Sequence, residues 1–70
     1  MRFNLSPLKG QTIHIDKVEA ASHVGGYFVK YKTPTGIKTA FVEKTHNRMD
    51  AVMQFYSEAR RAGVNIRDET

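Results

Sequence analysis

The strongest structural signal in this chain is the segment YFVKYKTPTGIKTAFVE, residues 27–43. Two runs rich in aromatic and branched side chains flank a Pro-Thr-Gly sequence, which is a typical turn signal between strands. Proline suits the second position of a type I turn, and glycine suits the position beyond it. We therefore predict strands at 27–33 and 37–43, joined by a three-residue hairpin loop, residues 34–36, with a bulge.

A further strand is predicted at residues 12–19. The sequence TIHIDKVE alternates isoleucines with His14 and Asp16, which is the period-two pattern of a half-buried strand. Residues 20–26 are small and end in two glycines, so they are predicted to form a loop between this strand and the hairpin.

The segment from residue 46 to about residue 62 has the pattern of an amphipathic helix. Thr45 and Asn47 are both candidate caps, and Asp50 lies in the first turn, where the backbone dipole favours a carboxylate. Gly63 suits the position just after the last turn. Six residues at helical spacing form the predicted apolar stripe: Met49, Val52, Phe55, Tyr56, Ala59 and Ala62.

These elements predict an α+β fold, in which a three-stranded antiparallel sheet (a meander) carries one C-terminal amphipathic helix on one face. The chain has 70 residues, which predicts a single small domain, 1–70. Met49 and Met53 are expected to fill the core beneath the sheet, although methionines also suit a soft binding surface. Because so small a core stabilises a domain only weakly, a homodimer or support from a partner is compatible with the sequence.

The composition excludes several classes of protein. There is no cysteine and no zinc-ligand spacing, which favours a reducing, cytoplasmic setting without a structural metal. No apolar run approaches the roughly 18 residues that span a bilayer, so no membrane association is expected. His14, His23 and His46 are widely spaced, and no serine lies in a nucleophile motif. We therefore expect a non-enzyme without a cofactor.

The positive charge is concentrated in one part of the chain. Residues 1–44 contain seven Lys and Arg against three Asp and Glu, whereas residues 45–70 contain four of each. The whole formal excess of +4 therefore lies in the first two-thirds, where it favours an anionic partner. The alternative is that the charge only keeps a small domain in solution.

The predicted turn assigns side chains to the two faces of the sheet. With a three-residue loop, Tyr31 lies opposite Thr39, and both face the helix, while the residues that alternate with them face solvent. A slip of one residue exchanges these roles. Exposed lysines follow phosphates, a two-stranded ribbon fits the major groove, and an aromatic side chain can stack on a base. The predicted nucleic-acid site is Lys30, Lys32, Lys38, Phe28, His14, Lys17 and Lys44.

The segment KTAFVEKTHNRMDAVMQFYSEARRAG, with the hairpin before it, resembles the end of an AP2-type or phage integrase arm-binding domain. Those domains are three-stranded sheets with one helix, and the sheet binds DNA. The resemblance implies that Thr39 and Phe41 lie on the DNA side, which is opposite to the face predicted from the turn. The chain has no tryptophan, and its hairpin contains no arginine. The residues that match the family pattern are Ala40, Phe41 and Val42 in the strand, and Ala51, Phe55 and Ala59 in the helix.

Two functions fit these features. The first is a small DNA-binding protein, such as an accessory or regulatory factor, which contacts duplex DNA through the lysine-bearing face of its sheet. The second is a protein-binding module, such as an inhibitor or adaptor of a phage or mobile element. That module would use a strand edge or the helix surface against an acidic host protein.

Overall fold

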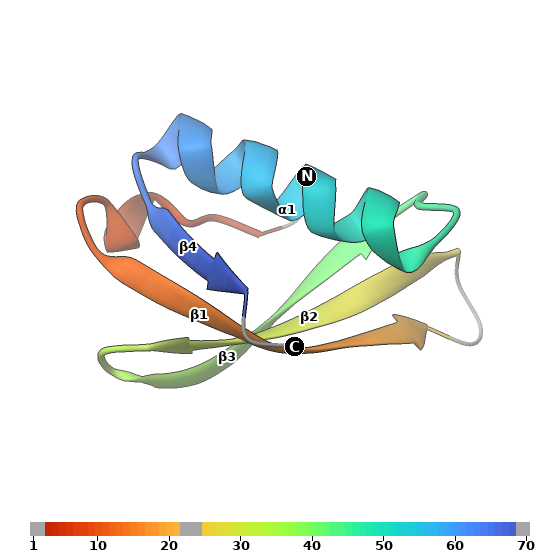
Figure 1. The fold of residues 1–70 in the computed structure, drawn as a ribbon, viewed down its shortest axis with the longest axis horizontal. Helices are drawn as coiled ribbons and strands as arrows, with labels where there is room; N and C mark the ends of the chain where they lie inside the picture. The colour runs from red at the N-terminus through yellow and green to blue at the C-terminus, as the bar shows by residue number, and fades with distance from the viewer. Residues whose placement is uncertain (1–2, 22–24, 69–70) are drawn as a thin grey trace.

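The computed structural model describes residues 3–21 and 25–68. It is an α+β fold in which one helix lies across one face of a sheet (Figure 1). The predicted fold class is therefore confirmed. In chain order the elements are a 3-10 turn η1 (Ser6–Leu8), β1 (Thr12–Ala21), β2 (Gly26–Thr33), β3 (Gly36–Glu43), α1 (Arg48–Ala62) and β4 (Asn65–Asp68).

The sheet has four strands in the order β3-β2-β1-β4, so the prediction of three strands is wrong in number. The β1–β2 and β2–β3 pairs are antiparallel, but β4 pairs with β1 in parallel. The sheet is therefore mixed and is not a pure meander. With only four residues, β4 is too short for a period-two pattern to be read from the sequence.

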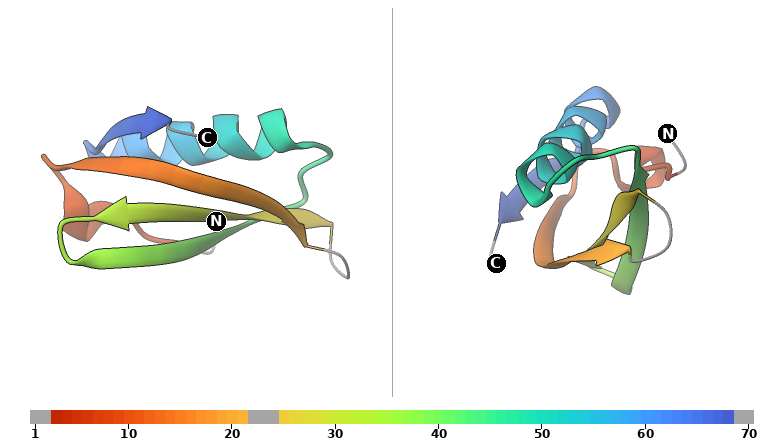
Figure 2. Two further views of the ribbon diagram at one scale, coloured as in Figure 1. Left: turned by 60° about the horizontal axis from the view of Figure 1, so that its bottom comes forward. Right: turned by 90° about the vertical axis from the view of Figure 1, so that its right-hand side faces the viewer.

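The strands extend into the segment that was predicted to be a loop, residues 20–26. Ala20 and Ala21 complete β1, and Gly26 begins β2. Residues 22–24 lie outside the described part of the chain. The long β1–β2 pair curls around α1 and the N-terminal segment, so that the face without the helix is the outer one (Figure 2).

The helix begins and ends at specific backbone interactions. The Asn47 side chain caps it by accepting a 2.8 Å hydrogen bond from the backbone N–H of Asp50. Thr45, the other candidate cap, is instead buried and donates to the carbonyl of Val42. At the other end Gly63 takes a left-handed conformation, with φ of 76°, which favours glycine at this position.

The predicted stripe of α1 is confirmed except at Met49: Phe55 and Ala59 are buried, and Val52, Tyr56 and Ala62 are partly buried against the core. Ala51, which the predicted stripe omits, is also buried. Met49 and Met53, which were expected to fill the core, are 70% and 64% exposed. The prediction for these methionines is wrong because the small side chains of Ala51 and Ala59 let the helix lie close to the sheet. The core therefore forms on their side of the helix.

Phe55 lies at the centre of the core. Its ring centroid is 5.3 Å from the ring centroids of both Phe3 and Tyr31, which come from the N-terminal segment and from β2. The core is thus closed by a segment that precedes the first predicted strand. The other buried apolar residues of the core are Leu5, Ile13, Ile15, Val29, Ala40, Val42, Ala51, Ala59 and Val64.

The turn after α1 directs the chain back along β1. The N–H of Gly10 donates to the carbonyl of Gly63, and the N–H of Asn65 donates to the carbonyl of Gln11, each at 2.9 Å. These bonds join the start of β1 to the start of β4. Ile66 then pairs with Ile13 and packs against the core, which gives β4 a partly buried side chain.

We expect Phe55→Ala to abolish cooperative unfolding. The ring is fully buried, and such a truncation costs about 3–5 kcal/mol, which is about all the stability that a domain of this size holds. Circular dichroism during heating would measure the effect. Met53→Ala, on the exposed side of the same helix, is the control and should melt like the parent. An unchanged melting temperature for Phe55→Ala would contradict the assignment of the core.

Stability should also fall at alkaline pH through Tyr31. Burial raises the pKa of its phenol above the ordinary value of 10.0, because the ionised form is poorly solvated there. The folded state therefore holds this proton more tightly than the unfolded state. The protonated Tyr31 therefore contributes to the free energy of unfolding below about pH 10, and this contribution is lost as the pH rises through the pKa of the folded state.

The measurement is the urea midpoint at pH values from about 9 to about 11, a range in which lysines also titrate. Tyr31→Phe is the matched control because it removes only the hydroxyl group. The parent should lose more stability across this range than the variant. Parallel pH curves for the two proteins would show that Tyr31 makes no such contribution.

Candidate nucleic-acid interface

The sheet face opposite α1 is not covered by another element of the described chain, and we refer to it as the open face (Figure 2). Along β2, Val29 and Tyr31 are buried on the helix side. The alternate residues Phe28, Lys30 and Lys32 therefore lie on the open face. These three residues occupy the face that the period-two pattern predicts for them.

The β2–β3 hairpin differs from the predicted register by one residue. Thr33 pairs with Gly36, so the loop contains only Pro34 and Thr35. The Thr33 hydroxyl closes this turn by donating to the carbonyl of Gly36 at 2.8 Å, and it also accepts the N–H of Thr35 at 3.2 Å. Gly36, with φ of 133°, turns the chain into β3.

The shorter loop exchanges the two faces of β3. Lys38 pairs with Tyr31 and therefore lies on the helix side, where it lines a hollow beside Asn4 and Leu8 of the N-terminal segment. Its assignment to the lysine face is wrong. Ala40 and Val42 are buried beneath the helix. The side chains of β3 on the open face are Ile37, Thr39, Phe41 and Glu43.

A bulge in β1 brings Lys17 to the open face. Strict alternation from the buried Ile13 and Ile15 would direct Lys17 towards the helix. The register shifts between Ile15 and Lys17, so that Lys17 pairs with Lys30 and Val18 pairs with Val29. Lys17 is exposed, whereas Val18 packs against the core.

The short strand β4 adds a cation that the sequence prediction did not include. Arg67 pairs with His14 and is exposed on the open face. Val64 and Ile66 do alternate with Asn65 and Arg67 after the helix, but four residues are too few for this alternation to predict a strand. Cross-strand pairing sets the open face in four rows. The rows are Arg67–His14–Lys32–Ile37, Lys17–Lys30–Thr39, Glu19–Phe28–Phe41 and Ala21–Gly26–Glu43.

Lys44 lies outside these rows. It follows the last residue of β3, has φ of 59°, and its N–H donates to the carbonyl of Gly25 at 2.7 Å. It is therefore at the end of the sheet near the start of β2, and its side chain is exposed.

The charges of the open face are partly compensated. The Lys17 ammonium is 3.4 Å from a carboxylate oxygen of Glu19, and that of Lys32 is 3.7 Å from Asp16. Both pairs are exposed, and such pairs contribute little energy in water. Lys30 is half-buried and has no ion pair within the described chain. With Arg67, the four Lys and Arg residues exceed by one the three acids of this face, Asp16, Glu19 and Glu43, so the face is weakly positive.

An aromatic pair lies near the far end of the open face. The ring centroids of Phe28 and Phe41 are 5.1 Å apart, and Phe28 remains 41% exposed. The Phe41 ring covers Gly26. A Cβ atom on Gly26 would lie 2.8 Å from Cζ of Phe41 and 2.7 Å from the Val42 carbonyl oxygen. Only glycine fits beneath this ring.

Within residues 3–21 and 25–68, no group of three or more His, Asp and Glu side chains is placed to hold a metal ion. In the same residues, no helix has the length and apolar character needed to cross a membrane. A scan of protein-family models, a search of curated proteins and a search of solved structures each find no match to this chain. Its function must therefore be inferred from its own surfaces.

We expect Gly26→Ala to destabilise the fold by about 1–3 kcal/mol, because the added methyl group must displace either the Phe41 ring or the β3 backbone. Gly25→Ala is the control, since a Cβ atom there meets nothing within 4 Å. Urea unfolding would compare both variants with the parent. Equal midpoints for the two variants would show that the Phe41 ring does not cover Gly26 in solution.

Proposed function

We propose that this chain is a small, non-enzymatic nucleic-acid-binding protein that contacts duplex DNA through its open face. The observation that supports this best is the cross-strand pairing of Lys17 with Lys30. Like charges directly opposite each other destabilise a sheet, and the exposed Glu19 carboxylate, 3.4 Å from Lys17, offsets only part of this repulsion. A phosphate between the two ammonium groups would convert that repulsion into attraction.

The neighbouring residues extend the same surface. Lys32 and Arg67 lie in the next row, on either side of His14. Adjacent strands are about 4.8 Å apart, so the four cations can reach several phosphates of one backbone. The outer face of a curled ribbon also has a suitable shape for the major groove of DNA, which accepts two strands.

Lysines neutralise phosphate without distinguishing bases, whereas bidentate arginines read guanine. The open face has three lysines and a single arginine. We therefore infer weak binding with little sequence preference. The exposed ring of Phe28 offers an apolar contact to sugars, or to a base where the duplex opens. A cytoplasmic location suits this function and the absence of cysteine.

The proposal is tested with Lys30→Gln combined with Lys32→Gln. Both changes lie on the open face, and each should alter stability by less than about 0.5 kcal/mol. Fluorescence anisotropy with a random-sequence duplex would give the affinity between about 50 and 200 mM salt. The parent should show a log–log salt slope of roughly −3 to −4, and the variant a slope flatter by about two units.

The matched control combines Lys9→Gln with Lys38→Gln, which removes the same charge from outside the open face. It should retain the parental salt slope. Equal losses in the two double variants would indicate diffuse attraction to net charge. If the protein binds a single strand more tightly than the duplex, the ligand is single-stranded nucleic acid and the proposal of duplex DNA is wrong.

A further inference from the structure

A second surface lies on the solvent side of α1, away from the open face. Met49, Met53, Tyr56 and Arg60 follow one another at spacings of four, three and four residues, so they form one ridge along the helix. We call these four residues the methionine ridge. Its two methionines are 70% and 64% exposed, so they contribute little to the core.

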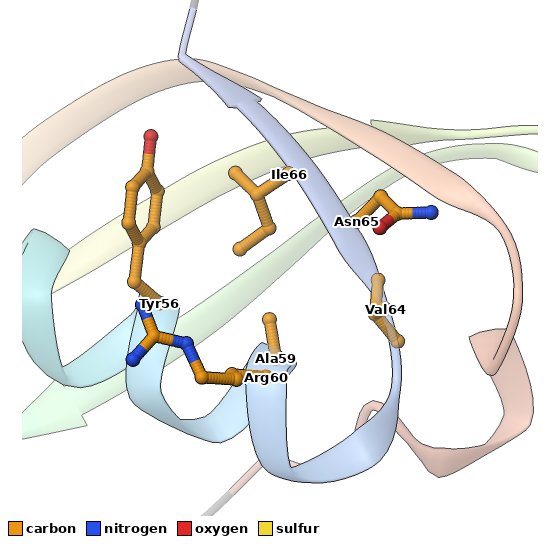
Figure 3. Close-up of a pocket in the computed structure, with 6 residues that line it drawn as sticks. All are labelled: Tyr56, Ala59, Arg60, Val64, Asn65 and Ile66. Atoms are coloured by element: carbon orange, nitrogen blue, oxygen red, sulfur yellow. The ribbon is translucent and has the colours of Figure 1, made fainter.

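Two hollows of about 300 Å³ each flank this ridge. One lies between α1 and β4 and is lined by Tyr56, Ala59, Arg60, Val64, Asn65 and Ile66 (Figure 3). The other lies along the helix and is lined by Met53, Tyr56, Ser57 and Arg60. Tyr56 and Arg60 line both hollows. The ridge and the hollows are therefore one continuous surface.

The composition of this surface suits a protein partner. Methionine side chains are flexible and polarisable, and they adapt to the shape of an apolar partner. Tyrosine and arginine are the residues that most often dominate binding at protein interfaces. Ile66 and Val64 give the α1–β4 hollow an apolar wall. A helical ridge beside a hollow matches the dimensions of a second amphipathic helix.

The charge at this site determines the kind of partner. Arg61 pairs with Glu58 at 3.7 Å, whereas Arg60 has no ion pair within the described residues. A partner that carries a carboxylate beside its apolar anchors would satisfy Arg60. A second copy of the chain fits less well. Two ridges packed in parallel would oppose Arg60 to itself, and two packed antiparallel would place it opposite Met49, which offers no carboxylate.

We propose that the methionine ridge and the α1–β4 hollow bind an acidic amphipathic helix of a partner protein. The apolar anchors of that helix would pack on Met49 and Met53 and enter the hollow beside Ile66. One of its carboxylates would pair with Arg60. This site lies on the opposite side of the molecule from the open face, so binding there does not require the proposed DNA function.

The probe is a synthetic helical peptide with leucine at positions i, i+3, i+4 and i+7 and glutamate between them. Its matched form has lysine in place of glutamate. Titration into isotope-labelled protein, followed by NMR, should shift the amide signals of Met53, Tyr56, Arg60 and Ile66, and not those of Lys30 and Thr39. Binding of the glutamate peptide alone is expected. Shifts centred on the open face, equal binding of both peptides, or no shifts at about millimolar peptide would overturn the proposal.

Substitutions test the two parts of the site. Met49→Gln with Met53→Gln should weaken peptide binding by about tenfold or more, and glutamine keeps the helix propensity of methionine. Ile37→Gln is the control, because Ile37 is 60% exposed but lies on the open face. Arg60→Gln should reduce the preference for glutamate, whereas Arg61→Gln, with the same change of charge, should not.

Equal effects of Arg60→Gln and Arg61→Gln would overturn the assigned role of Arg60. Analytical ultracentrifugation of the free protein tests whether a second copy of the chain binds this surface instead. A dimer that dissociates in the double methionine variant would show that the surface binds a second copy, and the proposal would be wrong. Failure of the peptide tests leaves DNA binding by the open face unaffected, because the lysine variants measure that function separately.

Discussion

The pairing of Thr33 with Gly36 is the constraint on which the other features of the sheet depend. It shortens the hairpin loop to two residues and so determines which residues of β3 face the helix. Ala40 and Val42 become part of the core, and Phe41 moves to the opposite side. A loop longer by one residue would expose the valine and bury the phenylalanine. The Thr33 hydroxyl and the positive φ of Gly36 favour the shorter loop.

A core of this size depends on segments from both ends of the chain. Phe3 and Leu5 precede the first strand, and Val64 and Ile66 follow the helix, yet all four pack on or in the core. The three-stranded sheet and the helix therefore do not bury enough apolar surface by themselves. The parallel pairing of β4 with β1 adds apolar burial at one edge of the sheet, and it also carries Arg67 to the open face.

The core separates two surfaces of different chemistry. The open face is basic, and its cations lie on three adjacent strands. The methionine ridge is mainly apolar and lies on α1, beside the hollow between α1 and β4. Cations on a sheet attract an extended polyanion, while an apolar ridge beside a hollow accepts a helix. Under the two proposals made above, the chain would hold a nucleic acid on one surface and a protein on the other.

The sequence by itself determined what depends on local periodicity. The strands near residues 12–19, 27–33 and 37–43, the helix that ends before Gly63, and the placement of Lys30 and Lys32 all follow from spacing along one segment. Only the tertiary structure decided what depends on pairing between segments. The hairpin register moved Lys38 away from the open face, a bulge brought Lys17 onto it, and a parallel strand added Arg67. A slip of one residue in strand pairing moves a side chain to the other face of the sheet. A strand that is too short to show a pattern is not predicted, so the face of its side chains is not predicted either. The free energy that determines the strand register comes from packing between segments that are distant in the sequence.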